Sequence, residues 1–153
     1  MEKTAVIERI RSVLQAQYEQ MLAAAKETSA GATDPENKAE GKYDTRGLEA
    51  SYLAAGQGEQ VAELAAALEM FQPSTFPDFE TGAEIASGAL VEANFGGELL
   101  YFVLSPKAGG LTCDFGGIEV TVLTPEAPLR QKMMGLKAGD SLPQPPMRIT
   151  RVL

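Results

Sequence analysis

One stretch, Gln72-Pro73-Ser74-Thr75-Phe76-Pro77-Asp78-Phe79, divides the sequence into two parts of different character. Its two prolines cannot continue a helix. The part before it is rich in Ala, Glu and Gln and contains a single proline, Pro35, whereas the part after it is rich in alternating β-branched residues and glycine pairs. The sequence therefore predicts a helical part over residues 1–72, a linker over 73–79 and a sheet domain over 80–153.

The helical part carries two apolar stripes whose steps alternate between three and four residues, as in a two-stranded coiled coil. The stretch Ala30–Asn37 between the stripes holds Gly31 and Pro35, which favour a turn. These features predict an antiparallel helical hairpin, a coiled coil with its tip near residues 30–42. The stripes consist of Ile7, Ile10, Leu14, Gln17 and Met21, and of Ala50, Ala54, Gln57, Val61, Leu64, Leu68 and Phe71.

Two glycines, Gly47 and Gly56, fall inside the second predicted helix. Each of them costs a helix about 1 kcal/mol relative to Ala. Close packing against the first helix, or contact with a partner, would account for their presence.

The sheet part consists of short predicted strands separated by glycine turns. These strands cover residues 84–92, 98–104, 111–115, 118–123 and 147–152, with turns at Asn94–Gly97 and Gly116-Gly117. A short helix is predicted from Pro125 to Leu136, with Thr124 as its N-cap. The fold class is therefore α+β, in which a small antiparallel sheet with one covering helix follows the helical hairpin.

The composition excludes several kinds of site chemistry. The 153 residues include no His, no Trp and one cysteine, Cys113. A His-based triad, a His/Cys zinc site and an intrachain disulfide are therefore excluded. Acid–base chemistry would have to come from carboxylates, Lys, Tyr or Cys113, and the strand pattern around Cys113 favours an ordinary buried thiol.

The charge and hydropathy of the chain limit the kinds of partner that we expect. There are 13 Lys and Arg against 21 Asp and Glu, and the formal net charge of −8 argues against direct DNA binding. The sequence has no apolar run of about 18 residues and no secretory leader, so we expect no membrane association. We expect a cytoplasmic protein in which Cys113 stays reduced.

The acidic residues near the predicted tip allow two interpretations. Thr33-Asp34-Pro35-Glu36 is a strong helix start, either with Asp34 as N-cap or with Thr33 and Glu36 as a capping box. Alternatively, Pro35 biases Asp34 toward extended backbone, which lets the carboxylates of Asp34 and Glu36 point to one side and approach a hard cation such as Mg²⁺. The two interpretations are compatible.

Two segments together resemble the bacterial Gre-type (GreA/GreB family) transcription elongation and transcript-cleavage factors. In the sheet part, a strand and a proline-started helix precede Gly135-Leu136-Lys137-Ala138-Gly139-Asp140, which differs from the family's pattern by one inserted position. At the tip, Asp34-Pro35-Glu36-Asn37-Lys38-Ala39-Glu40, followed by Tyr43, resembles the family's acidic motif with the two acids one residue closer together. The chain is similar to a short, divergent branch of this family.

The resemblance implies an FKBP-like sheet domain and a hairpin that enters the secondary channel of RNA polymerase. The polymerase core would be the partner, RNA would be reached only through the polymerase, and the protein would have no bound cofactor or enzymatic activity of its own. Asp34 and Glu36 would share a Mg²⁺ with the polymerase active site and assist its cleavage of backtracked RNA. The implied partner-binding residues are Asn37, Glu40 and Tyr43 at the tip, and Leu129 and Met133 on an exposed apolar patch of the sheet domain.

Two alternatives to a cleavage factor stay open. The altered spacing of the tip acids favours a non-catalytic secondary-channel regulator, similar to the inhibitory Gre homologues or the Rnk-type regulators. The presence of Asp34, Glu36 and Asn37 favours a cleavage factor instead. A prolyl isomerase would also match an FKBP-like domain, but the sequence shows no clear aromatic-lined pocket and contains no Trp.

Overall fold

The computed structural model describes residues 1–33 and 46–153, with side chains for residues 1–28 and 56–153. The chain groups into two compact units, one formed by Met1–Arg11 with Met70–Leu153 and the other by Ser12–Glu69. We call them the sheet unit and the helical unit. The start of the chain thus belongs with the sheet and not with the rest of its helix.

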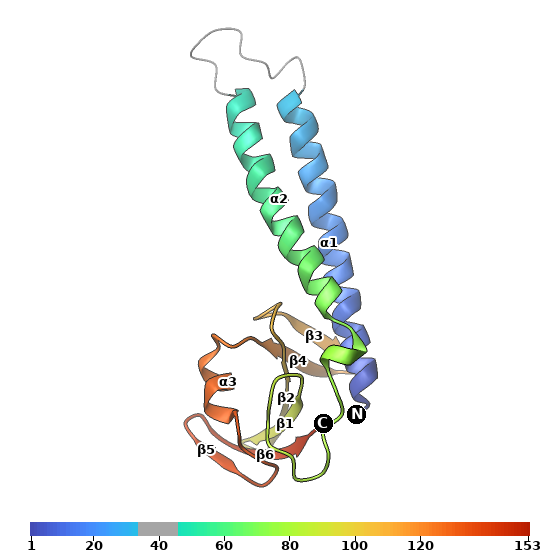
Figure 1. The fold of residues 1–153 in the computed structure, drawn as a ribbon. Helices are drawn as coiled ribbons and strands as arrows, with labels where there is room; N and C mark the ends of the chain where they lie inside the picture. The colour runs from blue at the N-terminus through green and yellow to red at the C-terminus, as the bar shows by residue number, and fades with distance from the viewer. Residues whose placement is uncertain (34–45) are drawn as a thin grey trace. The chain divides into compact units, whose positions relative to one another are not determined.

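The sheet unit contains six strands in the order β3-β4-β2-β1-β6-β5 (Figure 1). Neighbouring strands are antiparallel except β2 and β4, which run parallel with Tyr101 opposite Val120. The α+β class is confirmed, but the prediction of an antiparallel sheet was wrong at this pair, because a strand pattern does not specify which strand lies beside which. The strands are β1 (Leu90–Phe95), β2 (Glu98–Leu104), β3 (Thr112–Phe115), β4 (Ile118–Leu123), β5 (Ser141–Pro143) and β6 (Pro146–Val152).

Two hairpins of the sheet, β1–β2 and β3–β4, are closed by glycine pairs. Gly96 and Gly97 have φ angles of 61° and 90° and connect β1 to β2, and Gly116-Gly117 connects β3 to β4 in the same way. Two-residue turns of this kind need a positive φ at both central positions, which Gly adopts without a steric penalty. The glycine pairs therefore determine the register of both hairpins.

Two predicted elements begin later than expected. The strand predicted over residues 84–92 starts at Leu90, because Gly88 adopts a φ of 91° and donates its N–H to the backbone oxygen of Leu104 at 2.8 Å. The helix predicted from Pro125 is the shorter α3 (Pro128–Met133). Before it, a 3.0 Å bond from the Ala127 N–H to the Thr124 oxygen closes a turn, so Pro128 occupies the start of the helix. Strand β5 was not predicted.

One face of the sheet carries a continuous apolar core. Val91 and Ala93 of β1 share this face with their cross-strand partners Phe102 and Leu100, and α3 adds Met133. Residues outside the regular elements complete it. The buried members of the core are Ile85, Ala89, Val91, Ala93, Phe102, Leu104, Met133, Leu142, Met147 and Ile149.

The opposite face is buried as well. Leu90, Val103, Val120 and Val122 on this face have no exposed surface. The first turns of α1 lie beside it (Figure 1), where the Nε–H of Arg9 donates to the backbone oxygen of Asp114 in β3 at 3.1 Å. A sheet covered on both faces explains why its central strands are apolar on both sides.

The helical unit contains most of two long helices, α1 (Lys3–Thr33) and α2 (Arg46–Met70). Helix α1 continues through Gly31 to Thr33, so the predicted turn does not begin at Ala30. In α2, Val61, Leu64 and Leu68 are half-buried or buried, as predicted. In α1 the stripe passes through half-buried Tyr18, whereas Gln17 is exposed, which corrects the predicted stripe by one position. The short 3₁₀ helix η2 (Pro73–Thr75) follows α2.

The packing reason expected for Gly56 is not found in the described part of the chain. A Cβ atom added at Gly56 would meet no atom within 4 Å, so space is available there. At Gly88, in contrast, a Cβ atom would lie 2.8 Å from the backbone oxygen of Thr75, at a positive φ.

We expect Gly56→Ala to raise the free energy of unfolding by about 1 kcal/mol, because Ala is the better helix former and meets no steric obstacle. Gly88→Ala should lower it by about 1–3 kcal/mol through backbone strain and the close contact. Urea denaturation of both variants measures the two effects. A destabilising Gly56→Ala would show that a contact at Gly56 has been missed.

Candidate partner-binding site

The predicted tip residues lie outside the described part of the chain. Asp34, Glu36, Asn37, Glu40 and Tyr43 all fall between Thr33, the last residue of α1, and Arg46, the first residue of α2. Among the described residues, no group of three or more His, Cys, Asp and Glu side chains is placed to hold a metal ion. The metal and polymerase contacts of the tip therefore stay predictions.

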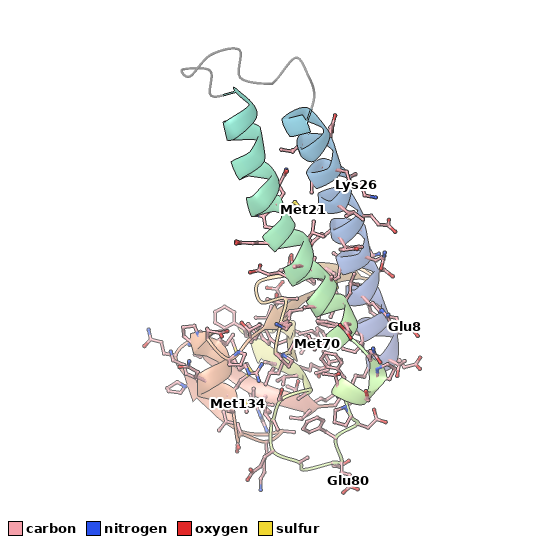
Figure 2. All side chains as sticks on the ribbon, turned by 45° about the horizontal axis from the view of Figure 1, so that its top comes forward. Glu8, Met21, Lys26, Met70, Glu80 and Met134 are labelled. Carbon is pink, nitrogen blue, oxygen red and sulfur yellow. The ribbon has the colours of Figure 1, made fainter. Side chains whose placement is uncertain are left out.

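The two predicted docking residues of the sheet unit are not both exposed. Met133 is fully buried in the core, and Leu129 is half-buried against the same cluster. They are four residues apart on α3 and so share the helix face that meets the sheet. The exposed methionine is Met134, directly after α3, with 42% of its surface accessible (Figure 2). The expected exposure of Met133 was therefore wrong.

The segment Gly135–Asp140, which carries the family resemblance in the sheet unit, is held by backbone bonds to distant residues. Gly135, at a φ of 81°, donates its N–H to the oxygen of Ile85 at 2.9 Å. Gly139, at a φ of 100°, donates to the oxygen of Ile149 at 2.7 Å. Both glycines are needed at a positive φ, where other residues are strained.

Asp140 closes the same segment. Its carboxylate accepts the N–H of Lys137 at 2.9 Å, and its backbone oxygen accepts the N–H of Ile149 at 2.8 Å. Asp140 thus forms a turn and extends the pairing beside β6. These contacts hold the segment to Ile85 before β1 and to Ile149 in β6.

Arg130 is a buried cation that the sequence analysis missed. Only 5% of its surface is exposed, and its Nη1 donates to the backbone oxygens of Ser105 at 2.7 Å and Leu123 at 3.0 Å. These two residues end or follow β2 and β4, the parallel pair. Burial lowers the pKa of the guanidinium, and the nearby carboxylate of Glu126 opposes that change. Arg130 therefore joins α3 to the ends of both parallel strands.

We expect Arg130→Met to lower the free energy of unfolding by about 2–4 kcal/mol, because two charged hydrogen bonds are lost and two carbonyl groups lose a partner. Chemical denaturation measures the change. Arg148→Met, at an exposed arginine of β6, is the matched control and should stay within about 0.5 kcal/mol of the wild type. Equal effects of the two substitutions would contradict the role given to Arg130.

A second buried polar group lies on the face of the sheet opposite the apolar core. Glu92 is 8% exposed, and its carboxylate accepts hydrogen bonds from the hydroxyls of Tyr101 at 2.7 Å and Thr150 at 2.8 Å. Arg151 lies 3.7 Å from the same carboxylate. The hydrogen bond to Glu92, and then burial, raise the pKa of Tyr101. Every described polar atom of this cluster has a partner, as a structural role requires.

Lys3 is the third buried polar group. Its Nζ donates to the backbone oxygens of Pro77 at 2.5 Å and Leu153 at 2.8 Å, and lies 4.8 Å from the centre of the Phe79 ring. Its surface is 7% exposed. Burial lowers the pKa of the amine to about 8, although the charge of Asp78 opposes the change. The two ends of the described chain are therefore tied together by one side chain.

The lowered pKa of Lys3 predicts a pH dependence of stability. Between about pH 8 and 10.5, the pKa of an ordinary lysine, the unfolded chain binds more protons than the folded one, so the free energy of unfolding should rise with pH. Relative to Lys3→Met, the wild type should gain about 1–3 kcal/mol across this range. Thermal or urea unfolding from pH 7.5 to 10.5 measures the difference. The exposed Lys26→Met is the control, and a flat difference between wild type and Lys3→Met would contradict the assignment.

The lone thiol is unsuited to nucleophilic chemistry. Cys113 is 6% exposed in β3, and burial raises its pKa, with the nearby Arg9 opposing the change. A buried thiol with a raised pKa is largely protonated near neutral pH and therefore a poor nucleophile. The expectation of an ordinary buried thiol is confirmed.

A search of the described helices for a membrane-spanning segment finds none that is both long and apolar enough. The polar groups of the sheet unit described above are engaged in structural contacts. The chemistry predicted for the tip belongs to residues 34–45, which lie outside the described part of the chain.

Several solved structures are similar to this chain. The crystal structure of the GreA factor homolog 1 (Gfh1) protein of Thermus thermophilus is 18% identical, with 94% of each chain covered and a TM-score of 0.38. Thermus aquaticus Gfh1 is 18% identical over 95% of this chain and 94% of its own, with a TM-score of 0.37. A structure of the transcription factor Gfh1 is 19% identical over 94% of this chain and 93% of its own, also with a TM-score of 0.37.

No protein-family model matches the sequence, and no curated protein matches it. At these identities and TM-scores the likeness to the solved structures is too distant to assign a function. The functional proposal below is therefore argued from the residues of this chain.

Proposed function

We propose that this protein is a cytoplasmic transcription elongation factor of the Gre type that binds core RNA polymerase. In this proposal, α1 and α2 pair as an antiparallel coiled-coil hairpin, and the sheet unit is an FKBP-like domain that docks on the polymerase. The hairpin enters the secondary channel and brings the tip residues to the active site of the polymerase. RNA is reached only through the polymerase, and DNA is not contacted.

The observation that carries the proposal is the pair of narrow apolar stripes on the two long helices. Tyr18 and Met21 of α1, and Val61 and Leu64 of α2, are half-buried at steps of three residues. The residues next to Tyr18, Val61 and Leu64 are exposed, whereas Leu22, next to Met21, is half-buried. A stripe of this width suits one partner helix and not a broad core. Because the helices flank residues 34–45, their pairing would present those residues at one end.

The length of the helices supports the same proposal. Residues 12–33 of α1 belong to the helical unit and correspond to about 33 Å of helix at about 1.5 Å per residue. Such a hairpin has few apolar side chains beyond the pairing stripe, so it suits insertion into a channel better than burial in an enzyme core. The acidic net charge of the chain suits a channel lined with basic groups.

The tip residues would supply carboxylate chemistry to the polymerase. Mg²⁺ prefers oxygen ligands and keeps open positions for water and phosphate. In this proposal Asp34 and Glu36 would share such an ion with the polymerase active site, where the metal assists hydrolysis of backtracked RNA. Asn37, Glu40 and Tyr43 would contact the channel. No metal is bound by the protein alone.

A non-catalytic secondary-channel regulator is the second candidate. Asp34 and Glu36 are two residues apart, and carboxylates at this spacing point to the same side only when the backbone is extended. If Glu36 is helical, the two carboxylates diverge and cannot share one ion. The protein would then occupy the channel and inhibit without supporting cleavage.

Transcript cleavage by stalled, backtracked polymerase tests the proposal. We expect the wild type to stimulate cleavage, and Asp34→Ala combined with Glu36→Ala to reduce the rate at least a hundredfold, about 2.7 kcal/mol of transition-state stabilisation. Polymerase binding, measured by native gel shift, should change little. The control is Glu80→Ala with Glu84→Ala, which removes two exposed carboxylates of the sheet unit.

The outcomes separate the candidates. Binding of the wild type without cleavage would support the non-catalytic regulator and reject the cleavage factor. Absence of any complex with core polymerase at micromolar concentrations would reject both candidates.

A further inference from the structure

Two rows of side chains cross one face of the sheet at the end where β1 turns into β2. In the first row, Asn94 lies opposite Leu99 on one side and Arg148 on the other. In the second row, Glu92 lies opposite Tyr101 and Arg151. Directly opposed residues share a face, and so do residues two apart on one strand. Leu99, Arg148 and Arg151 therefore stand on one face.

A β-bulge places both arginines there. Arg148 and Arg151 are three residues apart and would lie on opposite faces of a regular strand. Between Glu92 and Ala93 the register shifts so that Thr150 is an extra residue on β6. The hydroxyl of Thr150 donates to the Glu92 backbone oxygen at 3.0 Å and to its carboxylate at 2.8 Å. The buried Glu92 thus stabilises the bulge that aligns the arginines.

The exposed side chains of this surface are apolar and cationic. Leu99 is 47% exposed, the Arg151 side chain is 46% exposed, and the side chain of Arg148 is exposed with no hydrogen bond or ion pair in the described part of the chain. A groove of about 380 Å³ runs beside Arg148 and is lined also by Asn94, Gly139, Ile149 and Thr150. Glu92, the carboxylate opposite these residues, is buried and lies 3.7 Å from Arg151, so one negative charge stands against two positive charges. The surface is therefore cationic on a chain whose net charge is −8.

We propose that Leu99, Asn94, Arg148 and Arg151 form a docking surface for an acidic segment of a partner protein. The arginines lie opposite residues two apart on β1, a separation of about 7 Å along the strand. The segment that fits carries two carboxylates at about that spacing and an aliphatic side chain against Leu99. We call these residues the arginine surface. This inference goes beyond the proposed function and does not depend on it.

A protein segment fits this surface better than a nucleic acid does. Two arginines neutralise only two phosphates, while the acidic remainder of the chain repels a long polyanion. The exposed Leu99 beside them offers contact to an aliphatic side chain. The combination of one apolar anchor and flanking charges is typical of protein interfaces.

NMR titration of the ¹⁵N-labelled full chain tests the proposal. The probe is a short peptide with leucine, glutamate and glutamate at alternate positions, and the control peptide has glutamine in place of both glutamates. We expect the glutamate peptide to shift the amides of the arginine surface and the glutamine peptide to bind at least tenfold more weakly. Arg148→Glu should weaken binding of the glutamate peptide at least tenfold, and Leu99→Ser should weaken it at least threefold.

The matched control is Lys26→Glu, which changes the net charge by the same amount at an exposed position of the helical unit (Figure 2). This substitution should weaken binding of the glutamate peptide less than twofold. The proposal would be overturned if Arg148→Glu and Lys26→Glu weakened peptide binding equally. It would also be overturned if the peptide shifted only amides of other surfaces, or shifted none at millimolar concentration. Tighter binding of a single-stranded RNA oligonucleotide at the same amides would overturn it in favour of a nucleic acid. Unchanged spectra far from the substitution show that each variant is folded.

Discussion

The parallel pairing of β2 with β4 is the constraint on which the sheet unit depends. Parallel neighbours cannot be joined by a tight turn, so the chain must leave the sheet after Leu104 and return. The hairpin of β3 and β4 is that return path, and Gly116-Gly117 reverses its direction. Because parallel strands end at the same edge, the carbonyl groups of Ser105 and Leu123 lie close enough for one guanidinium, that of Arg130, to bind both.

The position of α3 and of the segment after it follows from this edge, where β2 and β4 end. Arg130 holds α3 there, which directs Met133 into the core. The segment Gly135–Asp140 then bonds back to residues before β1 and within β6. The segment Gly135–Asp140, the part of the sequence that most resembles a Gre-type sheet domain, therefore has a structural role: its backbone bonds connect distant parts of the sheet unit. Its pattern bears on the fold, whereas the proposed chemistry depends on the residues between α1 and α2.

The buried charged groups of the sheet unit share one function. Lys3, Glu92 and Arg130 each bind partners far from them in the sequence, at the chain ends, at the bulge and at the parallel edge. A buried charge is costly unless its hydrogen bonds are satisfied, so each position admits few alternatives. Glu92 has a further consequence, since the bulge it stabilises aligns two arginines on a surface that is otherwise free for a partner.

Local sequence determined the elements whose causes are local. Proline and glycine positions placed the boundary after α2 and both glycine turns, and alternation placed β2 and β4 at their observed bounds. Periodicity found the stripes of α1 and α2, with an error at Gln17 because neighbouring residues differ by only 100° around a helix. The family resemblance suggested an exposed Met133, and the pattern of a short helix does not say which side meets the sheet.

Only the tertiary structure decided what depends on strand order and on distant partners. The parallel pair, the burial of Arg130, the bulge at Glu92 and the bond from Lys3 to Leu153 each join residues far apart in the chain. No local pattern encodes such contacts, because they arise from the order in which strands pair and from the need to satisfy buried charges. The sequence alone thus specified where most of the elements lie, and the packing of the sheet specified which polar residues hold them together.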